Sequence, residues 1–204
     1  MSKKWLVIST LGISLPGIIL LFWHVTLPDD FHVGRKLQAR GFDVYYDTLL
    51  RHPTGVSGAF TPEDFRLICQ LPRLDHVCFG SDMSDLNLDG IENCRNLSEV
   101  SFIGVTNFSA NEIRKLAACP IKSIWLSSCV DLKDSDLEVF RELTQLETLD
   151  LYNNPGITDA CLEYLEKIPS LEWVAHNVTS ITPESSEEFR KKRPDVTFHF
   201  QKIF

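Results

Sequence analysis

One stretch of this sequence decides its fold: Leu146-Glu-Thr-Leu149-Asp-Leu151-Tyr-Asn-Asn154-Pro-Gly-Ile157-Thr-Asp-Ala-Cys-Leu162-Glu-Tyr-Leu165. In its first half, apolar residues alternate with polar ones, which is typical of a strand with one buried face. In its second half, apolar residues stand five and eight positions after Ile157, where they share one face of a helix. The stretch therefore predicts a strand, a turn and a helix in succession.

The second half of this stretch is a phrase that occurs six times. Successive starts are separated by 23, 25, 24, 25 and 24 residues. A Leu-rich period of about 20–29 residues indicates a solenoid, because no single unit can bury its own hydrophobic face. The phrase starts at Phe60, Met83, Phe108, Leu132, Ile157 and Ile181. The strand pattern before it recurs as Leu74/Val77/Phe79, Leu97/Val100/Phe102, Ile121/Ile124/Leu126, Leu146/Leu149/Leu151 and Leu171/Val174.

The combined pattern Leu-x-x-Leu-x-Leu-x-x-Asn with Ile-Thr-Asp-Ala-Cys-Leu resembles the leucine-rich repeat superfamily over residues 41–204. It is most similar to the cysteine-containing and bacterial subtype, and membrane-anchored proteins of planctomycete-like bacteria have a similar plan. The resemblance implies an α/β solenoid with short parallel strands on a concave face and helices on the convex face, and it is nearly silent on function. Asp82, Val105 and Cys129 stand where Asn154 does, so no continuous asparagine ladder is expected.

The polar residues of the phrase are predicted to cap helices. Thr158 or Asp159 can supply the capping oxygen, and Thr61 and Thr182 each precede a proline, which is favoured in a first helical turn. Capping accounts for these residues without any catalytic role. The corresponding residues in the other units are Ser84-Asp85, Ser109 and Asp134.

Residues 5–27 contain no Asp, Glu, Lys or Arg, and their 23 positions exceed the roughly 20 that span a bilayer. Lys3 and Lys4 precede them, which predicts a cytoplasmic N-terminus over residues 1–4, a membrane anchor over 5–27 and an extracytoplasmic remainder. The alternative is secretion after signal cleavage, but the apolar stretch is long for a signal peptide and lacks an Ala-x-Ala site.

Residues 28–58 are predicted to be a tether and N-terminal cap, and 59–204 to be a repeat domain of about five to six repeats. A short helix over 33–40 would cover the open end of the solenoid, and the Pro and Gly content of 51–58 predicts a turn-rich loop. His176 replaces an inward apolar residue, so we expect irregular last turns that close with a strand over 196–200.

Charge and cysteines restrict the function. The net charge of −8 argues against nucleic acid as a partner, and the one basic run, Arg190–Arg193, suits the end of a helix. Cys94 and Cys119 occupy core positions of the repeat, whereas Cys78 is expected to face solvent on a strand. No disulfide pair is predicted, although an oxidising compartment leaves one open.

Alternate strand positions point away from the core and are predicted to form the binding surface. A central column is expected at Tyr45, Cys78, Ser101, Trp125, Asp150, Ala175 and His199. Exposed aromatic residues are typical of binding sites, whereas a loop or a chain terminus covering them is the competing interpretation. The predicted partner-binding residues are Ile103, Trp125, Asp150, Tyr152 and Trp173.

The sequence therefore predicts a membrane-anchored protein that binds an unknown protein partner through its concave sheet. The alternative is a scaffold that assembles a membrane complex through its own residues 5–27. No catalytic, cofactor or metal motif occurs in the sequence, so we expect neither an enzyme nor a cofactor.

Overall fold

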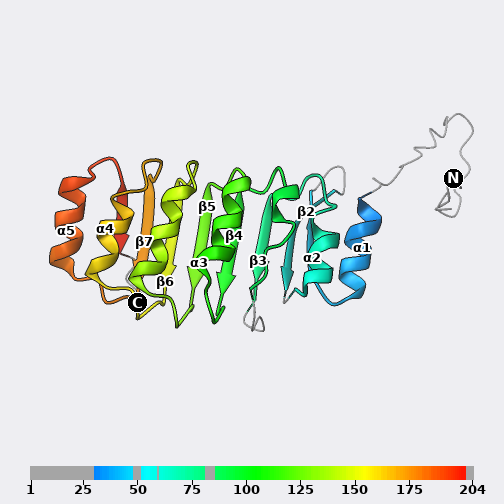
Figure 1. The fold of residues 1–204 in the computed structure, drawn as a ribbon, viewed down its shortest axis with the longest axis horizontal. Coiled ribbons are helices and arrows are strands. Elements are labelled where there is room, and N and C mark those ends of the chain that lie inside the picture. Colours follow the sequence, from blue (N-terminus) through cyan, green and yellow to red (C-terminus); the bar gives the residue numbers. More distant parts are fainter. Residues whose placement is uncertain (1–29, 48–51, 59, 81–85, 201–204) are drawn as a thin grey trace, which may run out of the picture.

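The computed structural model describes residues 30–47, 52–58, 60–80 and 86–200. They form an eight-stranded sheet in the order β1 to β8, in which β1 is antiparallel to β2 and the later neighbours are parallel. Figure 1 shows an elongated molecule, with α1 near one end and α5 at the other. This is the α/β solenoid that the repeats predict.

The strands are short and regularly spaced along the chain. They are β1 (Asp43–Tyr46), β2 (Pro53–Gly58), β3 (His76–Phe79), β4 (Glu99–Ile103), β5 (Ser123–Ser127), β6 (Thr148–Tyr152), β7 (Trp173–Asn177) and β8 (Thr197–Phe200). The α-helices are α1 (Phe31–Ala39), α2 (Pro62–Ile68), α3 (Ala110–Arg114), α4 (Leu162–Leu165) and α5 (Pro183–Lys192). The 3-10 helices are η1 (Ile91–Asn93), η2 (Lys115–Ala118), η3 (Asp134–Glu142) and η4 (Asp159–Cys161).

The predicted inward strand residues form continuous rows across the sheet. One row pairs Val77, Val100, Ile124, Leu149 and Val174 on successive strands, and all five are fully buried. Full burial of each such side chain stabilises the fold by about 1.5–3 kcal/mol. The strand part of the repeat is therefore confirmed.

The helical part of the repeat is confirmed, as an α-helix in α2, α3, α4 and α5 and as a 3-10 helix in η1 and η3. Leu137 and Phe140, which the spacing places inward, are buried, yet they lie in a 3-10 helix. A 3-10 helix rises about 2.0 Å per residue against 1.5 Å in an α-helix. A 3-10 helix therefore covers the length of a strand with fewer residues than an α-helix. This suits repeat units of only 23 to 25 residues.

Three of the predicted helix caps are confirmed, and one of them is Thr158, whose Oγ1 accepts a hydrogen bond from Ala160 N at 3.3 Å. Thr61 Oγ1 accepts a hydrogen bond from Asp64 N at 3.3 Å, and the Thr61 N–H donates to Asp64 Oδ2 at 3.1 Å. Thr182 Oγ1 accepts from Ser185 N at 3.2 Å. Ser109 makes no such side-chain bond, and Ser84-Asp85 lies outside the described residues.

The aspartates of the phrase connect neighbouring units instead of capping their own helices. Asp134 accepts bonds from Thr158 N at 2.8 Å and Thr158 Oγ1 at 2.7 Å, one unit further along the chain. Asp159 binds Thr182 in the same way, at 2.7 and 3.0 Å. Of the alternatives Thr158 and Asp159, the cap is therefore Thr158, and the prediction of Asp134 as an own-helix cap is wrong. Each carboxylate lies instead against the next unit's Thr.

Asn154 forms a second connection between units. Its Oδ1 accepts from Cys129 N at 2.9 Å, and its Nδ2 donates to Leu126 O at 2.8 Å. The side chain is fully buried, so these bonds satisfy main-chain groups that water cannot reach. In the preceding unit Cys129 occupies this position and donates its S–H to Phe102 O at 3.5 Å. Of these two units, only the later one has an asparagine at this position.

The N-terminal cap differs from the prediction over residues 51–58. The expected short helix is present as α1, but the expected loop contains β2, which pairs with β3. Pro53 begins this strand, where a proline is tolerated. A Cβ at Gly55 would lie 3.1 Å from Tyr45 Cδ2, so a larger residue there has to displace the Tyr45 ring.

The added strand also changes the predicted central column. Tyr45 pairs with Gly55 and so belongs to the row of His76, two residues before Cys78. The predicted place of Tyr45 in the column of Cys78 is therefore wrong, because β2 fixes a different register.

The C-terminal end closes as predicted, with β8 beside β7. His176 is buried there, and its ring centroid lies 4.5 Å from that of Phe198. The predicted span 5–27 lies outside the described residues, and within the described part no helix is long and apolar enough to cross a membrane.

Candidate binding surface

The five predicted binding residues lie on four consecutive strands. Ile103 is on β4, Trp125 on β5, Asp150 and Tyr152 on β6, and Trp173 on β7. Trp125 pairs in register with Asp150. All five occupy positions that alternate with the buried row, so they belong to the sheet face that points away from the core. We call these five residues the outer-face surface.

Two large apolar side chains of this surface are open to solvent. Ile103 is 47% exposed and Trp125 is 38% exposed, whereas Asp150, Tyr152 and Trp173 are partly exposed. Neither Ile103 nor Trp125 belongs to the buried hydrophobic core. The packing of the described residues therefore leaves both side chains uncovered.

The rest of the predicted central column is less accessible than expected. Cys78 and Ser101 are only 9% exposed, and Ala175 is buried. Ser101 pairs in register with Trp125, and Ala175 pairs with Asp150 and His199, so larger neighbours about 4.8 Å away shield these two small side chains. The prediction that Cys78 faces solvent is wrong.

The aromatic residues of the outer-face surface lie apart. Trp125 and Trp173 are two strands from each other, which corresponds to roughly 10 Å. Among the described residues, no ring of Trp125, Tyr152 or Trp173 pairs with another aromatic ring. Each ring therefore keeps an edge or face that another molecule can contact.

Asp150 lies between these side chains and is partly desolvated. Its Oδ1 accepts a hydrogen bond from Tyr152 N at 2.8 Å. Burial raises the pKa of Asp150 above its usual value, and the Tyr152 N–H opposes that rise. Within the part of the chain that the structure describes, Asp150 forms no ion pair. The carboxylate can therefore accept a cationic group from outside.

A serine–histidine contact on the same face was not predicted. Ser101 Oγ lies 3.2 Å from His76 Nε2, and Glu99 Oε1 lies 4.0 Å from the same ring nitrogen. In a hydrolytic triad the acid holds the other ring nitrogen, so that the base is oriented toward the nucleophile. This arrangement lacks that geometry. The contact depends on strand register, so no local motif could have revealed it.

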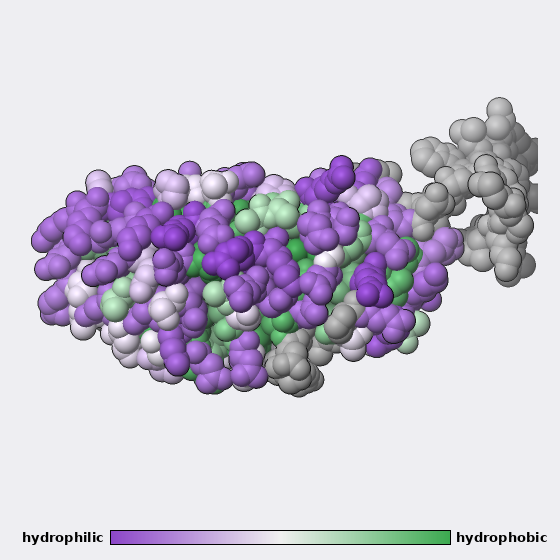
Figure 2. All heavy atoms as spheres, in the orientation of Figure 1, coloured by the Kyte–Doolittle hydropathy of each residue, from purple (hydrophilic) through white to green (hydrophobic). Residues whose placement is uncertain are grey.

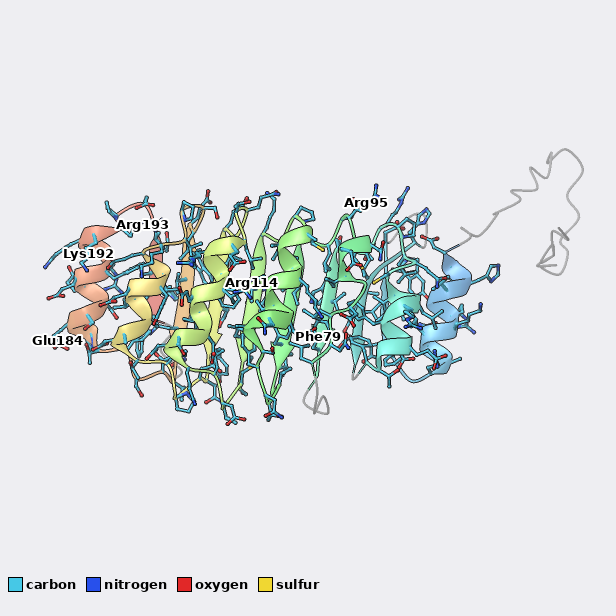
Figure 3. All side chains as sticks on the ribbon, viewed as in Figure 1. Phe79, Arg95, Arg114, Glu184, Lys192 and Arg193 are labelled. Carbon is cyan, nitrogen blue, oxygen red and sulfur yellow. The ribbon has the colours of Figure 1, made fainter. Side chains whose placement is uncertain are left out.

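The basic run at the end of α5 serves the fold. Arg193 donates to Ile168 O at 3.2 Å and to Leu171 O at 3.2 Å, and Lys192 pairs with Glu166 at 2.8 Å. Figure 3 labels Arg193 and Lys192 at this end of the molecule.

The face drawn in Figure 2 carries mostly hydrophilic side chains. Among the described residues, no group of three or more His, Cys, Asp or Glu side chains could hold a metal ion.

Comparisons with known proteins find only distant similarity. No protein-family model matches the sequence, and no curated protein matches it. A Bacteroides fragilis protein of known structure is 23% identical over 65% of this chain, with a TM-score of 0.48. Internalin C2 of Listeria monocytogenes is 16% identical, with 87% of this chain and 88% of that chain covered and a TM-score of 0.49.

A Leptospira interrogans leucine-rich-repeat protein is 16% identical over 66% of this chain and 51% of its own, with a TM-score of 0.33. The chain spans 43% of the length of the Bacteroides fragilis protein. Similarity at this level carries no argument about function. The solenoid is established by the chain's own sheet and repeats.

Proposed function

We propose that this protein binds another protein through the outer-face surface. The observation that supports this proposal most strongly is the exposure of Ile103 and Trp125 on adjacent strands. Exposed apolar side chains of this size mark interaction sites, and Trp and Tyr are frequent among residues that dominate binding energy. The core of the fold does not use either side chain.

The dimensions of the surface suit the centre of an interface. From β4 to β7 there are three strand spacings, or about 14 Å. An α-helix with its side chains is about 10–12 Å wide, so a single helix or extended segment has to run across the strands to contact all four of them. A complete interface buries about 800 Å² on each partner, so polar residues around the surface would form the rim.

The charge of the surface indicates the chemistry of the partner. Asp150 lacks an ion-pair partner among the described residues and is partly desolvated. A partner that buries Asp150 without neutralising it would leave an unpaired charge, which costs several kcal/mol. We therefore propose a partner segment with apolar side chains and at least one Arg or Lys that pairs with Asp150. Arg suits the site best, because its planar guanidinium can bind a carboxylate through two bonds.

We also propose that residues 5–27 anchor the protein in a membrane, with residues 1–4 cytoplasmic and the repeat domain extracytoplasmic. Their 23 uncharged residues support this. Protease added to intact cells should then digest the repeat domain, and alkaline washing should leave the protein with the membrane. Recovery of the whole chain in the soluble fraction after washing contradicts the anchor and favours secretion after cleavage.

The same segment supports a second candidate function, the assembly of a membrane complex through residues 5–27. In that case partner contacts would involve the anchor, and variants on the sheet would leave them intact. The two functions thus differ in which part of the chain touches the partner.

The proposal is tested by capture of partners on the full chain, with wild type compared with Trp125→Ala/Trp173→Ala. We expect the double variant to lose the partner while its thermal midpoint stays within a few degrees. Tyr45→Ala is the matched control, since Tyr45 is 53% exposed and lies in the same row as Trp173 at the far end of the sheet. Equal capture by the double variant contradicts the proposal.

A further inference from the structure

Two thiols from neighbouring units lie in direct contact. Cys94 donates its S–H to Cys69 Sγ, and the sulfur–sulfur distance is 3.2 Å. Cys69 follows α2 directly and Cys94 follows η1 directly, so each residue ends a helical element. They stand 25 residues apart, which is one turn of the solenoid. No described cysteine is in a disulfide.

The backbone around both residues is held in place. Cys69 N donates to Phe65 O at 3.0 Å, and Cys94 N donates to Ile91 O at 2.8 Å. Cys69 Sγ donates to Gly90 O at 3.0 Å, which orients its side chain toward the next unit. The two sulfurs have to approach by only about 1.2 Å to reach the S–S bond length of about 2.0 Å. Their contact therefore suits a disulfide.

We propose that Cys69 and Cys94 form a reversible disulfide that joins the first two units of the solenoid. The oxidant is a disulfide-bonded thiol compound, such as oxidised glutathione or an oxidised thiol–disulfide oxidoreductase. The Cys69 thiolate attacks a sulfur of that disulfide and expels one thiol. Cys94 then attacks Cys69 Sγ in the mixed disulfide and expels the second thiol. Two protein thiols are oxidised, one disulfide is reduced, and the two protons leave with the expelled thiols.

The surroundings of the two sulfurs favour this order of attack. Cys69 is partly exposed, whereas Cys94 is buried, so the oxidant can reach Cys69 first. The hydrogen bond that Cys94 donates lowers the pKa of Cys69, although partial burial and Glu92 oppose this. The same bond and burial raise the pKa of Cys94. Cys69 is thus the more readily ionised thiol, and the thiolate is the attacking species.

The other cysteines are poorly placed for this reaction. Cys119, a further 25 residues along, is buried, donates its S–H to Ile91 O at 3.1 Å, and has its pKa raised to about 11 by burial. Burial also raises the pKa of Cys78, Cys129 and Cys161. Oxidation should therefore select Cys69 and Cys94.

The test uses the full chain, reduced, freed of reductant and then incubated with oxidised glutathione. After alkylation and tryptic digestion, mass spectrometry should show the fragment 67–73, which contains Cys69, linked to the fragment 74–95. Fragment 74–95 also contains Cys78, so the experiment is repeated with Cys78→Ser. We expect the linked fragments in wild type and Cys78→Ser and their loss in Cys94→Ser.

Three outcomes overturn the proposal. Cys69 and Cys94 could both remain alkylated after oxidation, Cys69 could retain glutathione in the wild type, or Cys69 could link to Cys78 or Cys119. The wild-type result alone decides the first two, so the test does not depend on the folding of any variant.

Discussion

Acidification should destabilise this protein through the buried ring of His176. The ring is 1% exposed, its Nε2 has no hydrogen-bond partner among the described residues, and its Nδ1 lies 3.3 Å from Thr179 Oγ1. Burial, together with the nearby Arg190 and His199, lowers the pKa of His176 to about 4. The folded protein therefore holds this imidazole neutral where the unfolded chain would protonate it.

The size of the effect follows from the two pKa values. With an unfolded value of about 6.5 and a folded value of about 4, the contribution is complete above pH 6.5 and is lost as the pH falls toward 4. Between pH 7 and pH 5 the loss is about 2 kcal/mol, and it approaches about 3 kcal/mol below pH 4.

The variant His176→Leu removes this pH dependence. It also gives β7 a leucine beside Leu151 of β6, because positions 151 and 176 pair in register. Urea unfolding at pH 7 and pH 5, followed by circular dichroism at constant ionic strength, gives the free energy of unfolding of both proteins. The wild type should lose about 2 kcal/mol more than the variant between these pH values. Equal losses in the two proteins would refute the reasoning, because other groups would then cause the pH dependence.

Three further predictions concern the connections between units. Asn154→Ala should lower the free energy of unfolding, measured by urea unfolding, by about 3 kcal/mol, because it leaves buried main-chain groups unpaired. A loss below about 1 kcal/mol would show that water replaces the side chain. Asp159→Ala should cost about 1 kcal/mol in the same assay, because Thr182 loses two bonds, and an unchanged midpoint would rule out that connection. Oxidation of Cys69 and Cys94 should add about 3.5 kcal/mol for a loop of 25 residues, as measured in urea without reductant, and Cys94→Ser should show no such gain.

The parts of the fold that local patterns specify could be predicted from the sequence. Leu149 and Leu151 are buried because alternate strand residues share a face, and Leu162 and Leu165 are buried because they share a helical face. Thr61 was predicted as a cap because its proline and acidic neighbours are adjacent in sequence. Each of these features depends on residues within one unit.

The features that could not be predicted depend on how the units meet. Asp159 binds Thr182, 23 residues away, and only the relative position of two units decides that contact. Gly55 resembled a turn residue, although it lies in a strand beside the Tyr45 ring. Cys78 lies at an outward strand position between Ser57 and Ser101 of the neighbouring strands, and yet it is only 9% exposed. The same limit applies to the outer-face surface, whose residues could be named but whose accessibility required the structure.

Site-specific photo-crosslinking tests the proposed function most directly. A photoreactive residue is placed in the full chain at Ile103, at Glu138 in η3 as a control on the helical side, or within residues 5–27. Illumination before purification should yield a protein adduct at position 103 and none at 138 or in 5–27. Adducts confined to 5–27 would instead support the scaffold, and adducts at 138 without one at 103 would contradict binding through the outer-face surface.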